Sequence, residues 1–434
     1  MELLTSPMDE VTKSSKNITP FGGLNFIYDA LGRAGIDKFI DQKIGYRSIL
    51  AKYSYSDVVL SLFGNTLVQG SFISDLELLK EKYSDQVFHK IPSPDTVEYV
   101  CQELKQPNLI KKGPNEIEHE LNYNNKFNEV LISLGVKTKQ LNIGEQGYIL
   151  DFDNVVVNNE KQDAKLTYKK VKGYHPNIAF IGRIPVHIEN HNGNTPARFE
   201  QFQTLERCFE NLNKHNIKIE HFRADSASYQ IDVINAMENW VKYFYIRMMD
   251  FEDIRQACSE IKEWKTIRIN HEIKEVASIQ YQPNHCKKAH RIVVTRHKRK
   301  DGQMDLLSGT AYTYQGIITN NEQMNEQSII EFYNARGDAE NSNRFLLNDF
   351  NFNHLPFPDM DTNTVYMYLM AMCATLFEWS KTILVKNKIR AITISMRTKA
   401  VCFHYITVAT TFIKHARKTI LKVFCSENYS ILKI

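Results

Sequence analysis

The sequence predicts a mixed α/β protein with a helical N-terminal domain and a β-rich insertion. From Phe21 to about Gln106, apolar side chains recur at helical spacing. From Gly147 onward, runs of β-branched residues and helical stretches follow one another in the order β-β-β-α-β-α-β, which is typical of a mixed sheet covered by helices. Between Phe251 and about Tyr314 this pattern gives way to short strands and turns, so an insertion is expected there.

The N-terminal part of the chain is predicted to form several short helices. Apolar residues in Leu24–Leu31 lie on one helical face, and Tyr55–Leu67 forms a second amphipathic run. Ser93–Thr96 combines N-cap residues with a proline, which marks the start of a third helix. Short helices joined by polar turns are compatible with a helix-turn-helix type module. Pro107–Asn125 is polar and is expected to be a linker.

Three strands are expected to form an antiparallel meander after Gly147. Their predicted ranges are Tyr148–Val157, Ala164–Val171 and Asn177–Glu189. The elements expected to follow are a helix at Thr195–Asn216, a strand at Ile217–Phe222, a helix at Tyr229–Trp240 and a strand at Tyr243–Met248. Asp151 and Asp153 lie on the first strand, and Asp225 follows the strand after the first helix. Strand ends are where sheets of this kind usually place their chemistry.

After the insertion, the main fold is expected to resume near Tyr314 and to enter further helices. Asn363–Val385 predicts a long apolar helix, and the basic segment that follows is expected to be helical as well.

Positive charge is concentrated in two segments, although the net charge of the chain is a modest +4. The segment from Lys381 onward holds eleven Lys or Arg residues and a single acid, Glu427. Residues 287–300 hold seven basic residues and no acid, and they end in Lys298, Arg299 and Lys300. Local positive surface of this kind favours a polyanion partner. A solvated charged face remains the alternative for each segment.

Composition and cysteine usage predict an intracellular soluble protein. The seven cysteines are scattered and include no CxxC pair, which indicates a reducing compartment. No signal peptide is visible at the N-terminus. The apolar run Val365–Phe377 is too short for a bilayer span and is followed by Glu378, so no membrane partner is expected.

Residues 333–340 carry three side chains that suit a metal ion beside a phosphate. On a helix, Tyr333, Arg336 and Glu340 return to one face because they are three, four and seven residues apart. The carboxylate of Glu340 is a metal ligand of the kind that Mg²⁺ prefers. The guanidinium of Arg336 can donate two parallel hydrogen bonds to phosphate oxygens. This segment raises the hypothesis of a phosphodiester enzyme.

Cleavage of a phosphodiester by two metal ions needs three or four carboxylates from separate elements. Asp151 on a central strand, Asp225 beyond an adjacent strand and Glu340 on a helix meet that requirement. Asp153 is an auxiliary candidate, because residues two apart on a strand point to the same side. A carboxylate-pair hydrolase acting on sugars also fits Asp151 and Glu340, but it leaves Arg336 and the basic segments without a role.

Four segments together resemble the signature of bacterial insertion-sequence transposases of the DDE class. They are Leu150–Asp153, Arg223–Ser226, Thr319–Asn320 and Tyr333–Glu340. Within that class the chain is most similar to the insertion-sequence family numbered 1380, a relative of the family numbered 4. The resemblance runs from about Phe21 to Phe377. It implies a ribonuclease-H-like fold with a β-strand insertion between the second aspartate and the glutamate, where residues 251–314 lie.

The resemblance also implies roles for individual residues. It makes Asp151, Asp225 and Glu340 the catalytic triad that holds two Mg²⁺ or Mn²⁺ ions, with Asp153 as a further ligand. Tyr333 and Arg336 become contacts to DNA phosphate. Members of the family often carry a lysine seven residues after the glutamate, but that position is Leu347 here. Arg344, one turn beyond Glu340, is expected to supply the missing charge. The expected DNA-binding residues are thus Tyr333, Arg336, Arg344, Lys298, Arg299 and Lys300.

The implied activity is cleavage at the ends of a mobile element and joining of the freed 3′ hydroxyls to target DNA. The implied partners are double-stranded DNA, both terminal inverted repeats and target, and a second copy of the chain in a synaptic dimer. The implied location is the bacterial cytoplasm, in association with the nucleoid. The alternative is a catalytically silent DNA-binding protein derived from such a transposase. Trp264, in the insertion, either packs locally or stacks on an extruded base.

The expected domain organisation follows from these predictions. It comprises a flexible arm at 1–20, a helical DNA-binding domain with a linker at 21–125, and the first part of the catalytic domain at 147–250. The β-rich insertion at 251–314, the second part of the catalytic domain at 315–385 and a basic helical segment at 386–434 complete the chain.

Overall fold

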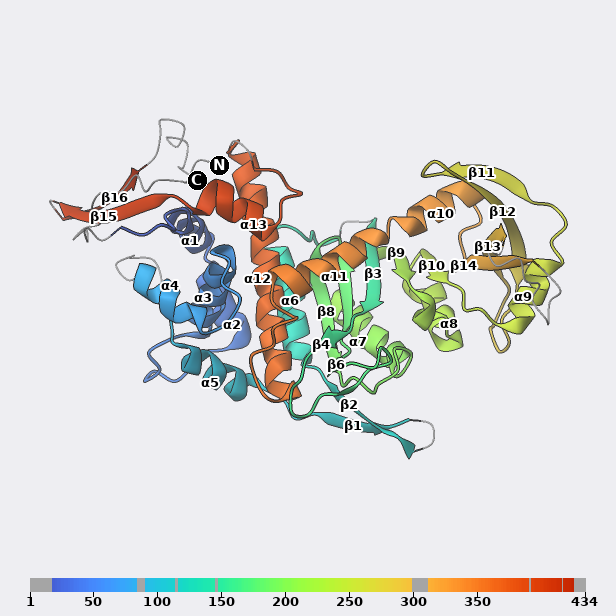
Figure 1. The fold of residues 1–434 in the computed structure, drawn as a ribbon, viewed down its shortest axis with the longest axis horizontal. Coiled ribbons are helices and arrows are strands. Elements are labelled where there is room, and N and C mark those ends of the chain that lie inside the picture. Colours follow the sequence, from blue (N-terminus) through green and yellow to red (C-terminus); the bar gives the residue numbers. More distant parts are fainter. Residues whose placement is uncertain are drawn as a thin grey trace, which may run out of the picture.

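The structure is a computed structural model that describes residues 18–83, 90–113, 116–144, 147–298, 311–389, 392–415 and 417–424. It is a mixed α/β fold in which a bundle of helices lies beside one large sheet (Figure 1). The predicted mixed α/β class is therefore confirmed.

The N-terminal bundle consists of five helices that lie beside a long sixth one (Figure 1). The five are α1 (Gly23–Arg33), α2 (Ile36–Ile44), α3 (Tyr55–Leu67), α4 (Asp75–Tyr83) and α5 (Pro94–Leu104). The long helix, α12 (Met360–Lys386), corresponds to the predicted apolar helix and is buried along most of its length. A helix that is apolar all round must be covered on every side. On one side α12 packs against α3 and α5, and on the other against the sheet and α6 (Asn125–Lys137) (Figure 1).

The predicted linker is a β-hairpin instead. Strands β1 (Leu109–Lys112) and β2 (Glu118–Asn122) pair antiparallel, and β2 adds to the edge of the large sheet. The polar composition of this segment resembles that of a linker, because a hairpin at a sheet edge faces solvent and keeps polar side chains.

The large sheet has a central unit of five strands. These are β8 (Ile184–His191), β7 (Asn177–Ile181), β3 (Tyr148–Asn154), β9 (Ile219–Ala224) and β10 (Tyr243–Arg247), in that spatial order. The β8–β7–β3 part is antiparallel, whereas β3, β9 and β10 run parallel. Three antiparallel strands followed by two parallel strands, in chain order 3-2-1-4-5, is the topology of a ribonuclease-H-like fold. The predicted fold is thus confirmed.

The meander is built from other strands than predicted. Its second and third strands are β7 and β8, which both come from the predicted third segment and are joined by a turn at Gly182. The predicted middle strand lies in a small separate sheet with the order β4-β6-β5, made of β4 (Val157–Asn158), β5 (Lys165–Leu166) and β6 (Lys172–Tyr174). A glycine with positive φ allowed a tight reversal inside one apolar run, which periodicity does not reveal.

Two helices cover one face of the central strands. They are α7 (Gln201–Lys214), which starts later than predicted, and α8 (Ile231–Trp240). Their apolar residues share one core with β3, β9 and β10. The N-terminal bundle, α6 and α12 form a second core, to which β7 and β8 contribute Ile178, Phe180 and Ile188.

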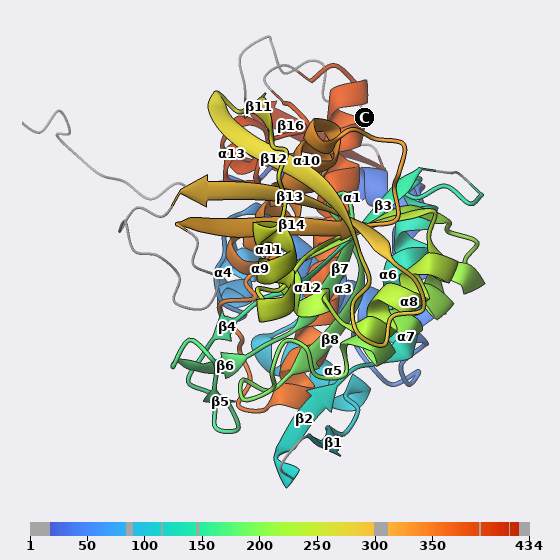
Figure 2. The ribbon, with the colours of Figure 1, turned by 90° about the vertical axis from the view of Figure 1, so that its right-hand side faces the viewer.

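The insertion strands continue the large sheet. Strand β14 (Tyr312–Thr319) pairs with β10, and it is followed outward by β13 (His290–Lys298), β12 (Glu272–Tyr281) and β11 (Lys265–Ile269). Helix α9 (Glu252–Ser259) precedes them, and α10 (Glu326–Asn334) packs against β11, β12 and β13 (Figure 2). Trp264 stacks on Tyr314 and lies under the Arg296 guanidinium, so it packs locally.

The described part of the C-terminal segment ends in a β-hairpin, contrary to the prediction of a helical segment. After the short helix α13 (Thr398–Val401) and a turn of π-helix at Cys402–Ile406, strands β15 (Ala409–His415) and β16 (Lys418–Phe424) form a two-stranded hairpin. Threonine, isoleucine and lysine residues alternate in these two segments, and this pattern favours a strand over the expected helix. Among the described helices, none is both long and apolar enough to cross a membrane.

Candidate active site

The candidate site lies where β3 and β9 end side by side. These strands pair in parallel with Asp151 opposite Arg223 and Phe152 opposite Ala224. Continuing that register places Asp153 beside Asp225, the residue that follows β9. The register therefore brings one aspartate of each strand to the same end of the sheet.

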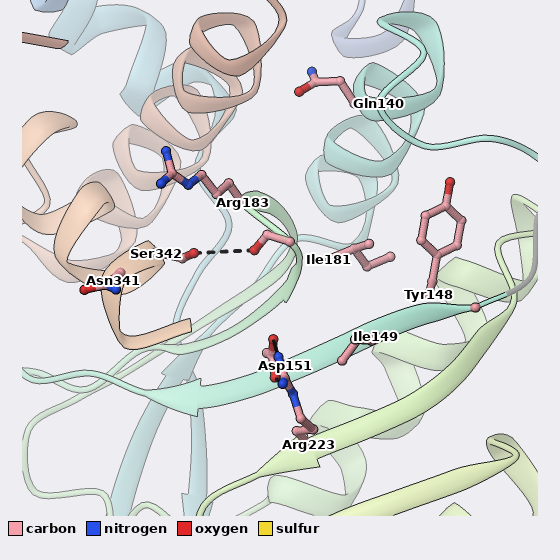
Figure 3. Close-up of a pocket in the computed structure, with 11 residues that line it drawn as sticks. Gln140, Tyr148, Ile149, Asp151, Ile181, Arg183, Arg223, Asn341 and Ser342 are labelled. Atoms are coloured by element: carbon pink, nitrogen blue, oxygen red, sulfur yellow. Dashed lines mark hydrogen bonds and ion pairs between the residues drawn. The ribbon is translucent and has the colours of Figure 1, made fainter. Parts of the chain in front are cut away.

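Asp151, two residues before Asp153 on β3, forms a buried ion pair with Arg223. Its two carboxylate oxygens accept hydrogen bonds from Nε and Nη2 of Arg223, both at 2.7 Å. Both side chains are about 95% buried. Arg223 also donates through Nη1 to the carbonyl of Phe332, near the end of α10, at 2.7 Å. The pair thus ties the sheet to α10, and it lies in the wall of a cavity of about 530 Å³ (Figure 3).

Asp153 is held by two side chains from the helical segment above the sheet. One oxygen accepts a hydrogen bond from Nη2 of Arg336 and the other from Nδ2 of Asn343, each at 2.7 Å. Burial raises the pKa of Asp153 to about 6; Arg336 opposes this rise, whereas the charges of Asp225 and Glu340 add to it. Asp153, Asp225 and Glu340 therefore share one electrostatic environment.

Arg336 interacts electrostatically with the carboxylates of Asp151, Asp153, Asp225 and Glu340. Its side chain is 8% exposed, and Nη1 lies 4.0 Å from an oxygen of Glu340. Burial by itself lowers the pKa of Arg336, but the Asp153 carboxylate and its neighbours outweigh burial and the pKa is raised. Nε of Arg336 and Oδ1 of Asn343 are buried and have no hydrogen-bond partner in the described part of the chain. An unpaired buried donor is costly, which favours an acceptor ligand at this point.

The helix predicted across residues 333–340 is interrupted. Helix α10 ends at Asn334, and α11 (Gly337–Asp349) begins three residues later. The backbone N–H of Arg336 bonds to the carbonyl of Tyr333, the tighter spacing that ends a helix. Gly337 weakens helix formation at this position. The break lets Arg336 point down to Asp153 while Glu340 stays 59% exposed.

The other predicted DNA-binding residues occupy different positions. The hydroxyl of Tyr333 donates to the carbonyl of Ala224 at 3.1 Å, which anchors α10 to β9. Burial raises the pKa of Tyr333 to about 12, so the hydroxyl remains a donor. Arg344 is exposed on α11, whereas Leu347 packs against the core of the helical bundle. Lys298 is exposed at the end of β13, and Arg299 and Lys300 lie outside the described residues.

The donor set suits hard divalent cations, which bind carboxylate and amide oxygens. Asp153, Asp225 and Glu340 are such donors, and their mutual repulsion is what a cation would relieve. Asp225 also accepts a hydrogen bond from the backbone N–H of Ala227 at 3.0 Å, which fixes its orientation. Within the described residues, no three His, Cys, Asp or Glu side chains stand close enough together to hold a metal ion as they are.

Sequence reasoning missed Asn343 as a partner of Asp153. Asn343 lies three residues after Glu340, so the two side chains share one face of α11. This spacing is the feature of the sequence that could have identified Asn343. From the sequence, Asp151 is expected in the triad and Asp153 as an auxiliary ligand, because a single strand does not reveal which of its two aspartates lies beside Asp225.

A scan against protein-family models matches residues 122–430 to "Transposase DDE domain group 1". This match covers most of the chain, so the chain belongs to this family of DDE transposases. The protein is a transposase of the DDE class, which confirms the broad resemblance seen in the sequence.

Among curated proteins no match was found. Among solved structures, the chain is similar to the cryo-EM structure of a piggyBac transposase synaptic complex with hairpin DNA. That comparison has a TM-score of 0.44 and 9% sequence identity, and it covers 90% of this chain and 80% of the other.

Proposed function

We propose that this transposase cleaves DNA at the ends of its element and joins the freed 3′ hydroxyls to target DNA, using one site. The observation that carries the proposal is the group of Asp153, Asp225 and Glu340 around the buried Arg336. We further propose that the chain belongs to the insertion-sequence family numbered 1380, as the sequence resemblance suggests.

In this proposal Asp153, Asp225 and Glu340 hold two Mg²⁺ or Mn²⁺ ions. Divalent ions supply Lewis acidity and neutralise charge on the attacked phosphate and the leaving oxygen. Asp153 takes the place in the triad that the sequence resemblance implies for Asp151. The support is that the register of β3 and β9 brings Asp153, and not Asp151, beside Asp225, and that the charges of Asp225 and Glu340 both act on the pKa of Asp153.

The neighbouring residues position the DNA and the helices. The free Nε of Arg336 supports a role as a phosphate donor, since guanidinium groups bind phosphate well. The Asp151–Arg223 pair holds the end of α10, and Tyr333 holds the same helix through Ala224. Both contacts fix the helix break from which Arg336 and Glu340 extend, so these residues act on the reaction by positioning.

The DNA partners are proposed on charge and family membership. We propose that Arg344, Lys298, Arg299 and Lys300 contact DNA phosphate and that the helical domain at 21–125 binds the terminal repeats. We also propose that two copies of the chain act together in a synaptic dimer, associated with the bacterial nucleoid. The domain boundaries predicted from the sequence are part of this proposal.

Cleavage of element-end DNA is the direct test of this function. Purified full-length protein with Mn²⁺ is expected to nick labelled DNA that carries the two ends flanking its gene, and to produce joined products with a target plasmid. Denaturing and native gels resolve nicks, hairpins and joined products. Specific binding without any metal-dependent cleavage would instead indicate the silent DNA-binding alternative.

The raised pKa of Asp153 predicts a pH-dependent cost in stability. A carboxyl whose pKa is raised from 3.8 to about 6 by folding stabilises the protein when protonated. That contribution is fully present below about pH 4 and is lost as the pH rises through about 6. Without divalent metal, Asp153→Asn is therefore expected to match the parent in stability near pH 4 and to exceed it by about 2–3 kcal/mol at pH 7.

Urea unfolding of the two proteins at pH 4, 5, 6 and 7 measures this difference. Asp232→Asn is a suitable control, because Asp232 is exposed on α8 and should show no such trend. A difference between Asp153→Asn and the parent that does not change with pH would contradict the prediction.

A further inference from the structure

Residues 165–172 form an exposed, strongly basic hairpin, here called the lysine hairpin. This segment contains Lys165, Lys169, Lys170 and Lys172 and no acidic residue. Lys165 pairs with Glu120, and the other three lysines are exposed. Tyr168 at the tip is 70% exposed, which is unusual for a large aromatic side chain. Neither basic segment singled out in the sequence includes this hairpin.

The base of the lysine hairpin is rigidly built. The backbone N–H and the hydroxyl of the buried Thr167 both donate to the carbonyl of Val171, at 2.8 and 2.9 Å. Gly193 packs directly beneath, where a Cβ atom would lie 2.2 Å from the carbonyl oxygen of Lys165. Such close packing requires glycine. The hairpin is thus a formed projection that presents its tip to solvent.

The lysine hairpin is joined to the proposed active site through the part of the chain that follows β3. It belongs to the small sheet of β4, β5 and β6. The first strand of that sheet, β4, follows closely in the chain after β3, the strand that carries Asp153 (Figure 1). The ring of Tyr168 lies over the buried His175, with ring centroids 5.6 Å apart. Burial lowers the pKa of His175, and the charges of Lys169 and Asp225 also act on it, so one histidine lies within electrostatic range of both.

An exposed aromatic ring among lysines suits single-stranded nucleic acid. Bases stack on aromatic side chains, and lysines neutralise the phosphates on either side. A base inside a duplex has both faces covered by stacked neighbours, whereas a base in a single-stranded overhang can turn out of the stack and offer a free face. Lys169 of the hairpin and Asp225 act electrostatically on the same histidine, and strand ends form at the carboxylates during the proposed cleavage.

We propose that the lysine hairpin binds the single-stranded DNA end next to the cleaved phosphate, with Tyr168 stacking on an unpaired base and Lys169, Lys170 and Lys172 contacting phosphates. This inference rests on the proposed function, because it assigns a DNA contact to the same site. It adds a surface that neither the family match nor the sequence motifs assign.

Binding of DNA ends by the full-length protein tests the proposal. Fluorescence anisotropy in EDTA, which prevents cleavage, compares a labelled duplex with a short single-stranded overhang and the blunt duplex of the same sequence. Tyr168→Ala is expected to weaken binding of the overhang DNA roughly 10-fold and to leave the blunt duplex nearly unchanged. Tyr168→Phe keeps the ring and is expected to bind both DNAs like the parent.

The lysines are tested by the salt dependence of binding. Replacing Lys169 and Lys170 together by Gln should reduce the slope of log K against log salt by about 1.4 to 1.8, since two phosphate contacts are lost. The matched control replaces Lys214 and Lys218, which are exposed near the amino end of β9, and should keep the parental slope.

Equal overhang binding by Tyr168→Ala and the parent would overturn the proposal, and so would equal losses in Tyr168→Ala and Tyr168→Phe. Each of these results leaves the proposed function standing if the parent still cleaves DNA with Mn²⁺. Failure of the parent to cleave, with binding intact, would count against the proposed function instead.

Discussion

Asp153→Asn is expected to reduce strand cleavage by about 10³-fold or more, with DNA binding largely retained. The reason is that a neutral amide cannot neutralise a divalent cation, and a loss of about 4 kcal/mol in transition-state stabilisation corresponds to this factor. Asp225→Asn and Glu340→Gln are expected to have the same effect, because the three carboxylates act as one unit and their losses are not additive.

The decisive comparison is with Asp151→Asn. If Asp151 positions α10 and does not hold metal, this variant keeps measurable cleavage while Asp153→Asn does not. Glu331→Gln is a matched control for Glu340, because Glu331 is exposed on α10 and hydrogen-bonds to Gln327. Gel assays of initial cleavage rates at equal DNA occupancy measure the effect. Abolished cleavage in Asp151→Asn together with near-parental cleavage in Asp153→Asn would reverse the assignment.

Asp151→Ala is expected to lower the free energy of unfolding by about 3–5 kcal/mol. It removes the partner of Arg223, whose guanidinium then remains as an uncompensated charge in a site that is about 95% buried. A loss of this size is a large share of the stability of a typical domain. It also releases the end of α10, since Arg223 holds the carbonyl of Phe332.

Adding Arg223→Met to Asp151→Ala is expected to restore part of that loss, because replacing both members of a buried ion pair by apolar groups is often nearly neutral. Urea unfolding of the two single variants and the double variant gives the coupling energy. Asp29→Ala is the control, since Asp29 pairs with Arg33 at the surface and such pairs contribute at most about 1 kcal/mol. A change below about 1 kcal/mol for Asp151→Ala would show that the pair is not structural.

Most of the secondary structure was predictable because it follows from local periodicity. The apolar residues of α12 define a helix wherever it packs, and the aromatic residues and isoleucines of β3, β9 and β10 define strands. Errors arose where a local signal was ambiguous. The turn at Gly182 divided one apolar run into β7 and β8, and the polar hairpin β1–β2 was mistaken for a linker.

The residues of the candidate site could be predicted from the sequence, but their arrangement in space could not. The sequence identified Asp151, Asp153, Asp225 and Glu340, since carboxylates at strand ends and on a helix are visible as a pattern. Which aspartate of β3 lies beside Asp225 depends on the register between β3 and β9. Sequence periodicity carries no information about that register.

By itself, the sequence determined the mixed α/β class, the buried helix α12 and the residue types of a DDE transposase. Only the tertiary structure decided that Asp151 is paired with Arg223, that Arg336 reaches Asp153 across a helix break, and that Tyr168 of the lysine hairpin lies over the buried His175. The physical reason is the separation along the chain of the residues that interact. Helix and strand preferences act between near neighbours in the chain, whereas ion pairs and strand register join residues far apart, such as Asp153 and Arg336, and are fixed by packing of the whole fold.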